Sequence, residues 1–354
     1  MPLIGLAMAL AASAVGELAE RTPALGVALP LVGLAALISV VFAAVYHADV
    51  IAHRTGEPYG TLVLTVAVTV IEVALILSIM LAGEGRPGLA RETVFSVIMV
   101  VCNGVVGLCL VLGGLRYGEQ GFRLPGASAY LVVLMPLATL TLILPTYTTS
   151  VAGPYYSESQ LGFVSLVTLA LYGMFLYVQT VRHRDYFLSD LGGASDEHAT
   201  PPGPRQLWES VVLLLVGLSA VVLLAKGVAG SMETMVVALG APIDAVGLLV
   251  ALLVLLPETV AALRAARRNE LQKSLNLALG SSLATIGLTI PAVSLLAIML
   301  NQPLELGIDL RETVLLVLTF GVSLVTFGGG RTNILPGFVH LVLFIVFVFM
   351  LFVP

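Results

Sequence analysis

Two glutamates, Glu72 and Glu258, lie in the middle of long apolar segments that are typical of membrane-spanning helices. A charged side chain at the centre of a bilayer costs about 2.5–3.5 kcal/mol on insertion scales, and acidic residues there usually mark ion pathways or proton relays. Carboxylate oxygens bind metal cations as well as protons. The two glutamates, one in each half of the chain, therefore predict a site where a cation and protons compete during transport across a membrane.

The composition is that of an integral membrane protein. Hydrophobic residues make up 58% of the chain and charged residues 10%, whereas soluble domains carry about 25% charged residues. The net charge of −5 comes without a basic patch, so we expect the lipid bilayer and no nucleic acid as a partner. We expect no cofactor besides the transported ions. The oligomeric state stays open, a homo-oligomer included.

Eleven apolar segments approach the length of about 20 residues that is needed to cross a bilayer. They lie near residues 3–18, 24–48, 60–82, 92–114, 128–148, 160–180, 208–228, 242–264, 273–300, 311–328 and 334–353. The first is a leading helix within residues 1–20. The other ten form two groups of five, within 21–181 and 208–354, on either side of a polar stretch at 182–207 whose composition predicts a flexible loop. The predicted fold class is an all-α integral membrane protein.

The order of these helices predicts an internal symmetry. Because five is an odd number, two such groups in series enter the membrane from opposite sides. Inverted repeats of this kind are common in secondary transporters, where the ion site lies at the midplane between the repeats. Glu72 and Glu258, 186 residues apart, each fall in the second helix of their group. They are therefore predicted to occupy equivalent positions in two inverted five-helix repeats.

Basic residues predict the orientation, because cytoplasmic loops carry an excess of Lys and Arg. When the loops are assigned alternately to two sides, one side holds eleven of the sixteen Lys and Arg. The N-terminus and the loop at 182–207 lie on that side, so we place both in the cytoplasm and the C-terminus outside.

Hydroxyl side chains recur at helical spacing near each glutamate. One stripe precedes Glu72, and the other lies in the segment 273–300 with Ser282 beside it. The members are Thr61, Thr65 and Thr69 in the first stripe and Ser274, Ser281, Thr285 and Thr289 in the second. Such stripes offer oxygen ligands along an ion path. The alternative is that each hydroxyl bonds a carbonyl of its own helix or lets neighbouring helices pack closely.

Three further polar or helix-disturbing residues lie within predicted spans. Pro257 directly precedes Glu258, and a proline inside a helix frees a carbonyl four residues back and bends or interrupts the helix. The freed carbonyl either joins the carboxylate at the ion or accompanies a simple kink. Asn103 either joins helices by hydrogen bonding or gives its amide oxygen to an ion. His340 is expected to be a packed, hydrogen-bonded histidine rather than a proton carrier.

Four ordered segments resemble the bacterial ChaA-type cation/proton antiporters, a branch of the calcium/cation antiporter superfamily close to the calcium/proton exchangers. They are GEPYGTLVLTVAVTVIEVAL, LLPETVAAL, LGSSLATIGLTIP and GRTNILPGFVHL. The resemblance covers nearly the whole chain and implies a leading helix, two inverted five-helix repeats and a place in the bacterial inner membrane. It puts the family's two glutamates on Glu72 and Glu258, its Gly-Ser motif on Gly280 and Ser281, and its first-repeat asparagine on Asn103.

The chain departs from the calcium/proton exchangers ahead of each glutamate. Where those proteins have Gly-Asn, it has Val-Thr at 68–69 and Val-Leu at 254–255, and Thr259 stands in place of their histidine. The resemblance implies that ChaA-type members share these departures, and that Ca²⁺, Na⁺ and K⁺ are their exchange ions. The missing asparagines are potential ligands, so calcium selectivity does not carry over directly.

These observations predict a transporter, not an enzyme, that exchanges a cation for protons by alternating access. Ca²⁺ is the first candidate because two glutamates neutralise its charge, and a monovalent-only Na⁺ or K⁺ antiporter is the alternative. An intramembrane serine hydrolase, with Ser281 as nucleophile and His340 as base, is a further alternative. The candidate cation- and proton-binding residues are Glu72, Glu258, Asn103, Ser281, Ser282, Thr69 and Thr285, with Glu72 and Glu258 as the metal ligands.

Overall fold

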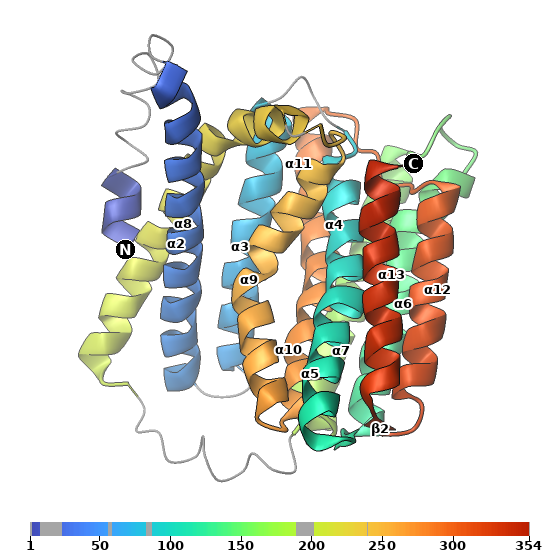
Figure 1. The fold of residues 1–354 in the computed structure, drawn as a ribbon. Coiled ribbons are helices and arrows are strands. Elements are labelled where there is room, and N and C mark those ends of the chain that lie inside the picture. Colours follow the sequence, from blue (N-terminus) through green and yellow to red (C-terminus); the bar gives the residue numbers. More distant parts are fainter. Residues whose placement is uncertain are drawn as a thin grey trace. The chain divides into compact units, whose positions relative to one another are not determined.

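The computed structural model describes residues 2–7, 23–55, 59–82, 87–188, 202–238 and 240–353. Most residues in these ranges are helical, and Figure 1 labels most of the long helices. After a short helical stretch at residues 2–7, the α-helices are α2 (Pro23–Thr55), α3 (Tyr59–Ala82), α4 (Leu89–Met99), α5 (Val106–Tyr117), α6 (Leu124–Ala138), α7 (Glu158–Tyr177), α8 (Pro204–Ala238), α9 (Ala245–Arg267), α10 (Leu271–Ala284), α11 (Ile290–Leu300), α12 (Leu310–Phe327) and α13 (Ile334–Phe352).

Shorter elements continue or join these helices. Four stretches are π-helical, namely η1 (Val100–Val105), η2 (Thr139–Ile143), η4 (Val178–Arg182) and η6 (Thr285–Thr289). Two are 3₁₀-helical, namely η3 (Leu144–Tyr147) and η5 (Arg184–Tyr186). A two-stranded antiparallel sheet pairs β1 (Gln120–Gly121) with β2 (Arg331–Thr332).

The helices confirm an all-α membrane protein. Within the described residues, nine helical stretches are long and apolar enough to cross a membrane, and a shorter apolar stretch at Val63–Ser78 lies inside α3. The nine are Leu31–Thr55, Leu89–Tyr117, Leu124–Tyr147, Glu158–Arg182, Pro204–Ala225, Ala245–Arg267, Leu271–Leu300, Leu310–Phe327 and Ile334–Phe352. Each falls on a predicted segment. The predicted leading segment lies mostly outside the described residues, so the count of eleven stays a prediction.

The chain divides into two compact units. The first consists of Met1–Arg86 with Thr200–Val246, and the second of Pro87–Ala199 with Gly247–Pro354. Each unit combines helices from both predicted groups of five. The predicted repeats therefore do not coincide with compact units, and their symmetry stays a prediction.

In the first unit, α2, α3 and α8 pack against one another. Small residues permit a close approach of α2 and α8, since a Cβ added to Gly217 would lie 3.3 Å from the Cβ of Ala44. Close packing through small side chains is a common way for membrane helices to associate. His47 Nδ1 lies 3.3 Å from Ser210 Oγ across the same pair of helices.

In the second unit, glycines bring α5 and α13 together. A Cβ added to Gly337 of α13 would lie 2.9 Å from both Leu110 Cβ and the Val111 backbone nitrogen. One added to Gly107 of α5 would lie 3.0 Å from the Leu341 backbone nitrogen. No side chain fits at either position without moving the partner helix.

We expect Gly337→Ala to lower the free energy of unfolding by about 1–3 kcal/mol, as is typical when a packed contact is overfilled. Gly321→Ala in α12 is the matched control, because nothing lies within 4 Å of its added Cβ. Both changes bring the same gain in helix propensity, so only the steric clash differs between them. Thermal unfolding in detergent measures the difference, and equal midpoints for the two variants would contradict the packing account.

The loops of the second unit gather in two sets, as alternating membrane crossings require. In one set, β1 pairs with β2, Gln120 Nε2 donates to Asn269 Oδ1 (2.9 Å), and the Arg123 amide donates to Gln272 Oε1 (2.7 Å). In the other set, the amide of Glu305 donates to the carbonyl of Pro87 (2.9 Å). Connections that alternate along the chain thus meet on the same side.

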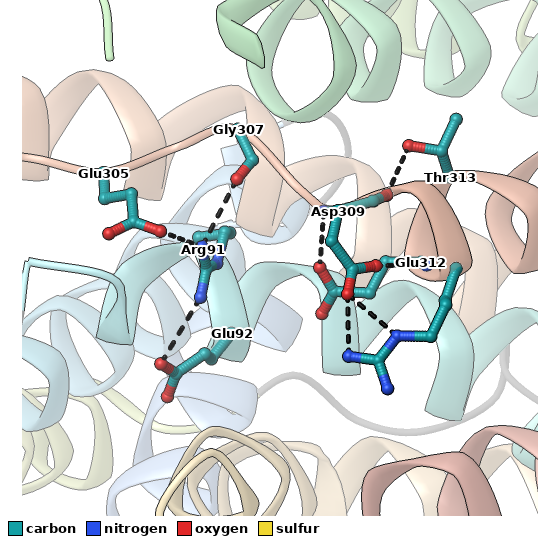
Figure 2. Close-up of polar contacts among 8 residues, drawn as sticks. Arg91, Glu92, Glu305, Gly307, Asp309, Glu312 and Thr313 are labelled. Carbon is teal, nitrogen blue, oxygen red and sulfur yellow. Dashed lines mark hydrogen bonds and ion pairs between the residues drawn. The ribbon is translucent and has the colours of Figure 1, made fainter. Parts of the chain in front are cut away.

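Arg91 ties the start of α4 to the loop before α12 (Figure 2). Its Nη1 pairs with Glu305 Oε1 and lies 3.3 Å from the Gly307 carbonyl oxygen, while its Nη2 lies 3.7 Å from Glu92 Oε1. The same close-up shows Asp309 beginning α12 with a reciprocal cap. Its Oδ1 accepts from the Glu312 amide (2.7 Å), and Glu312 Oε2 accepts from the Asp309 amide (3.0 Å).

We expect Asp309→Ala to lower the free energy of unfolding by about 1 kcal/mol at pH 7 through loss of this cap. Partial burial raises the pKa of Asp309, but the Glu312 amide and the Arg311 guanidinium outweigh it and hold the pKa below its usual value. The charged form therefore stabilises the fold fully above the usual pKa of aspartate, and the contribution is lost as the pH falls through the lowered pKa.

Thermal unfolding between pH 7 and pH 3 checks this expectation, with Asp309→Ser as a control that keeps a capping oxygen. An Asp309→Ala penalty that is the same at every pH, or one that Asp309→Ser shares in full, would show that the cap is not its source.

Candidate ion-binding site

Glu72 lies in the middle of α3, in the first unit, and is 1% exposed. Its neighbours along the helix, Ile71, Leu75 and Ile76, are also buried. One turn back, Thr69 is partly buried, and its hydroxyl donates to the Thr65 carbonyl at 2.9 Å. The proton of Thr69 is thus used within the helix, and the lone pairs of its oxygen remain for a ligand.

Glu258 lies in α9, in the second unit, and is partly buried. Pro257 is buried beside it, and α9 runs through this proline without interruption. Pro257 thus does not interrupt the helix, and a role of the freed carbonyl at the ion stays a prediction. A proline still has no amide hydrogen, so the carbonyl of Leu253, four residues back, loses its normal partner within the helix.

The predicted hydroxyl stripe lies on α10 and η6. Ser281 is partly buried, whereas Ser282 and Thr285 are 0% and 4% exposed. Among the described residues, Ser282 Oγ has no hydrogen-bond partner. Thr285 opens the π-helical stretch η6, and π-helical turns inside α-helices frequently occur at functional sites.

Asn103 lies in the π-helical stretch η1 and belongs to a buried chain of hydrogen bonds. Its Nδ2 donates to Thr319 Oγ1 at 2.8 Å, and its Oδ1 lies 3.1 Å from His340 Nδ1. The other ring nitrogen of His340 lies 3.0 Å from Thr326 Oγ1. These four side chains are at most 5% exposed. Asn103 therefore joins η1 to α12 and α13, which is one of the two roles open for it.

The π-helical stretches η1 and η6 fall in the third helix of each predicted group of five. Within the second unit, η1 packs against α10, and η6 packs against α4. The structure thus brings the segment of Asn103 against the helix of Ser281 and Ser282. Glu72 and Thr69 belong to the first unit, and their meeting with Glu258 at one site stays a prediction. Among the described residues, no group of three or more His, Cys, Asp or Glu side chains could hold a metal.

Two features of the site region were not predicted from the sequence. One is the pair of hydrogen-bond partners of His340, Thr326 and Asn103, and the other is the hydrogen bond from Asn103 to Thr319. The seven-residue spacing of Thr319 and Thr326 placed both on one face of their segment and was the available signal. His340 is a packed, hydrogen-bonded histidine, as expected. Neither of its nitrogens is left to act as a base for Ser281, so the serine hydrolase alternative lacks its base.

Comparisons with known proteins agree over most of the chain. The chain matches the sodium/calcium exchanger protein family over residues 25–181 and 209–353. The y4hA protein of Sinorhizobium fredii, named as a candidate ionic transporter, is 47% identical over 95% of this chain and 92% of its own length. The sodium-potassium/proton antiporter ChaA of Escherichia coli is 39% identical over 92% of this chain and 89% of its own length.

The solved structure of native YfkE has the same fold, with a TM-score of 0.75 at 17% identity over 100% of both chains. This structural match agrees with the family match in covering both halves of the sequence. The chain therefore belongs to the sodium/calcium exchanger protein family, a family of multi-pass membrane transporters rather than enzymes.

Proposed function

We propose that this chain is a secondary active transporter that exchanges an inorganic cation for protons across a membrane. The observation that carries the proposal is the burial of Glu72, 1% exposed in the middle of α3, in a chain of the exchanger family. Acidic residues at that depth are rare and usually mark ion pathways or proton relays, and carboxylate oxygens bind a cation as well as a proton. Because both compete for the same oxygens, the release of one favours the binding of the other.

The proposed ligands come from four helices. Glu72 and Glu258 are the carboxylates that the cation and the protons share. The further proposed oxygen ligands are Thr69, Asn103, Ser281, Ser282 and Thr285. Support comes from the buried Ser282 hydroxyl, which lacks a partner among the described residues, and from the π-helical turns at Asn103 and Thr285. Alternating access to the two sides of the membrane would then couple the two fluxes.

The choice of cation follows from the charge and number of the ligands. Ca²⁺ takes six to eight oxygens, with carboxylates among them, and two glutamates neutralise it. The second candidate function is exchange of monovalent cations only. It is favoured by the 39% identity to an antiporter named for sodium and potassium, and by the absence of Gly-Asn ahead of each glutamate.

We further propose the bacterial inner membrane as the location, with the N-terminus and the loop 182–207 in the cytoplasm and the C-terminus outside. The excess of Lys and Arg on one set of loops supports this orientation.

The proposed organisation is a leading helix in 1–20 and inverted repeats in 21–181 and 208–354. The two sets of loops in the second unit, and the π-helical turn in the third helix of each group, support it.

Reconstituted vesicles test the proposed function. Purified protein is inserted into proteoliposomes with an acidic interior, and Ca²⁺, Na⁺ and K⁺ are added outside in separate experiments. We expect at least one cation to release protons, as followed with a pH-sensitive dye. A response to Ca²⁺ supports the first candidate, and a response to Na⁺ or K⁺ alone supports the second. Correctly inserted protein that responds to none of the three would refute cation/proton exchange.

A further inference from the structure

We propose that His340 is a positioning residue for cation binding, because it fixes the orientation of the Asn103 amide within η1. This inference rests on the proposed function, since it concerns the affinity of the same ion site. The contact joins α13 to η1 across 237 residues of sequence. Both side chains are 0% exposed, so the bond is shielded from bulk solvent.

In this chain of hydrogen bonds, the donor or acceptor role of each group fixes the role of its neighbour. An amide oxygen only accepts, so Asn103 Oδ1 requires the proton of His340 to be on Nδ1. His340 Nε2 is then an acceptor, and the hydroxyl of Thr326 donates to it. At the other end, Asn103 Nδ2 donates to Thr319 Oγ1. Each bond therefore supports the orientation of the next, and the neutral form of His340 satisfies all of them.

The position of Asn103 explains why its orientation matters for the ion. Its oxygen has two lone pairs, and the bond to His340 uses one of them. The stretch η1 packs against α10, the helix of Ser281 and Ser282. Without the bond from His340, a buried amide oxygen would lose its donor, which makes its present orientation unfavourable. A ligand held by fixed neighbours binds better than one that must first be ordered.

The roles of the two variants of His340 follow from these bonds. Leucine fills much of the ring volume but neither donates to Asn103 nor accepts from Thr326. Glutamine keeps a donor and an acceptor on a side chain of similar reach. The apolar variant thus removes the positioning function, and the polar variant retains it.

Proteoliposome exchange with the wild type, Glu72→Gln, His340→Leu and His340→Gln tests the inference, using whichever cation the wild type responds to. We expect His340→Leu to raise the KM for that cation about tenfold with a maximal rate within about twofold of wild type. His340→Gln should restore the KM to within about threefold. An unchanged KM in His340→Leu, a loss confined to the maximal rate, or equal KM values in the leucine and glutamine variants would overturn the positioning role.

Two controls distinguish a failure of this inference from a failure of the proposed function. A wild type that is silent toward Ca²⁺, Na⁺ and K⁺ refutes the proposed function, and the inference falls with it. An active wild type and an inactive Glu72→Gln leave the proposed function standing, so the KM values of the two His340 variants alone then decide the inference.

Should His340→Leu fail to give monodisperse protein, Thr326→Val replaces it, because it removes only the hydrogen bond between Thr326 and His340. Thr326→Ser is its matched control, and the same KM outcomes support or overturn the role.

Discussion

Replacing Glu72 with glutamine is expected to abolish exchange for every cation that the wild type transports. The amide has nearly the same shape, but it carries no charge for a cation and has no site for a titrating proton. Since Glu72 is 1% exposed, water cannot take over its role. We expect the initial rate of cation-driven proton release to fall by at least about 100-fold, which corresponds to about 2.7 kcal/mol of lost stabilisation.

The matched control for this variant is Glu158→Gln, the same chemical change at the exposed first turn of α7. It should leave the rate within about twofold of wild type, because an exposed group contributes little to a buried site. Equal monodispersity of the two variants in detergent shows that folding is not the cause. Exchange by Glu72→Gln at more than a tenth of the wild-type rate would rule out this carboxylate as the shared ligand.

Replacing Glu258 with glutamine is expected to separate divalent from monovalent exchange. A glutamine at this position resembles a glutamate that stays protonated. Ca²⁺ then faces a single negative charge and should be transported at least about 100-fold more slowly. A monovalent cation needs only one carboxylate, so any Na⁺ or K⁺ exchange that the wild type shows should fall by about tenfold or less.

Parallel assays of Glu258→Gln with Ca²⁺, Na⁺ and K⁺ measure this separation, with Glu270→Gln as the control at the junction of α9 and α10. Equal losses for divalent and monovalent cations would contradict the one-carboxylate mode for monovalent ions. Ca²⁺ exchange at the wild-type rate in Glu258→Gln would show that Glu258 is not a ligand of the transported cation.

The helices were largely predictable because lipid imposes a length and an apolar composition on every span. The predicted ends were less accurate. The predicted segment ended at residue 228, whereas α8 continues to Ala238. Hydropathy reports which residues suit lipid, while backbone hydrogen bonds decide where a helix ends. At the start of α6, Pro125 lies in the first turn, where a proline loses no helical hydrogen bond.

Irregular helical backbone was expected at Pro257 but occurs elsewhere. The proline at 257 marked α9 as the candidate for a break, yet α9 is continuous there. The π-helical stretch η1 contains no proline, whereas η6 ends two residues before Pro291. A π-helical turn depends on how a helix is held by its neighbours, and hydropathy does not encode it. The helix contact of Asn103 likewise became visible only through its partners, Thr319 and His340.

The sequence by itself determined that the chain crosses a membrane many times and carries a carboxylate within the apolar run of two spans. This follows because a bilayer selects residues one position at a time, so a buried acid is visible without knowing its surroundings. Only the tertiary structure decided which polar groups meet, such as Asn103 with Thr319 and His340, which lie 216 and 237 residues further along the chain. Such pairings depend on the rotation and packing of whole helices, which the pattern of one segment does not contain.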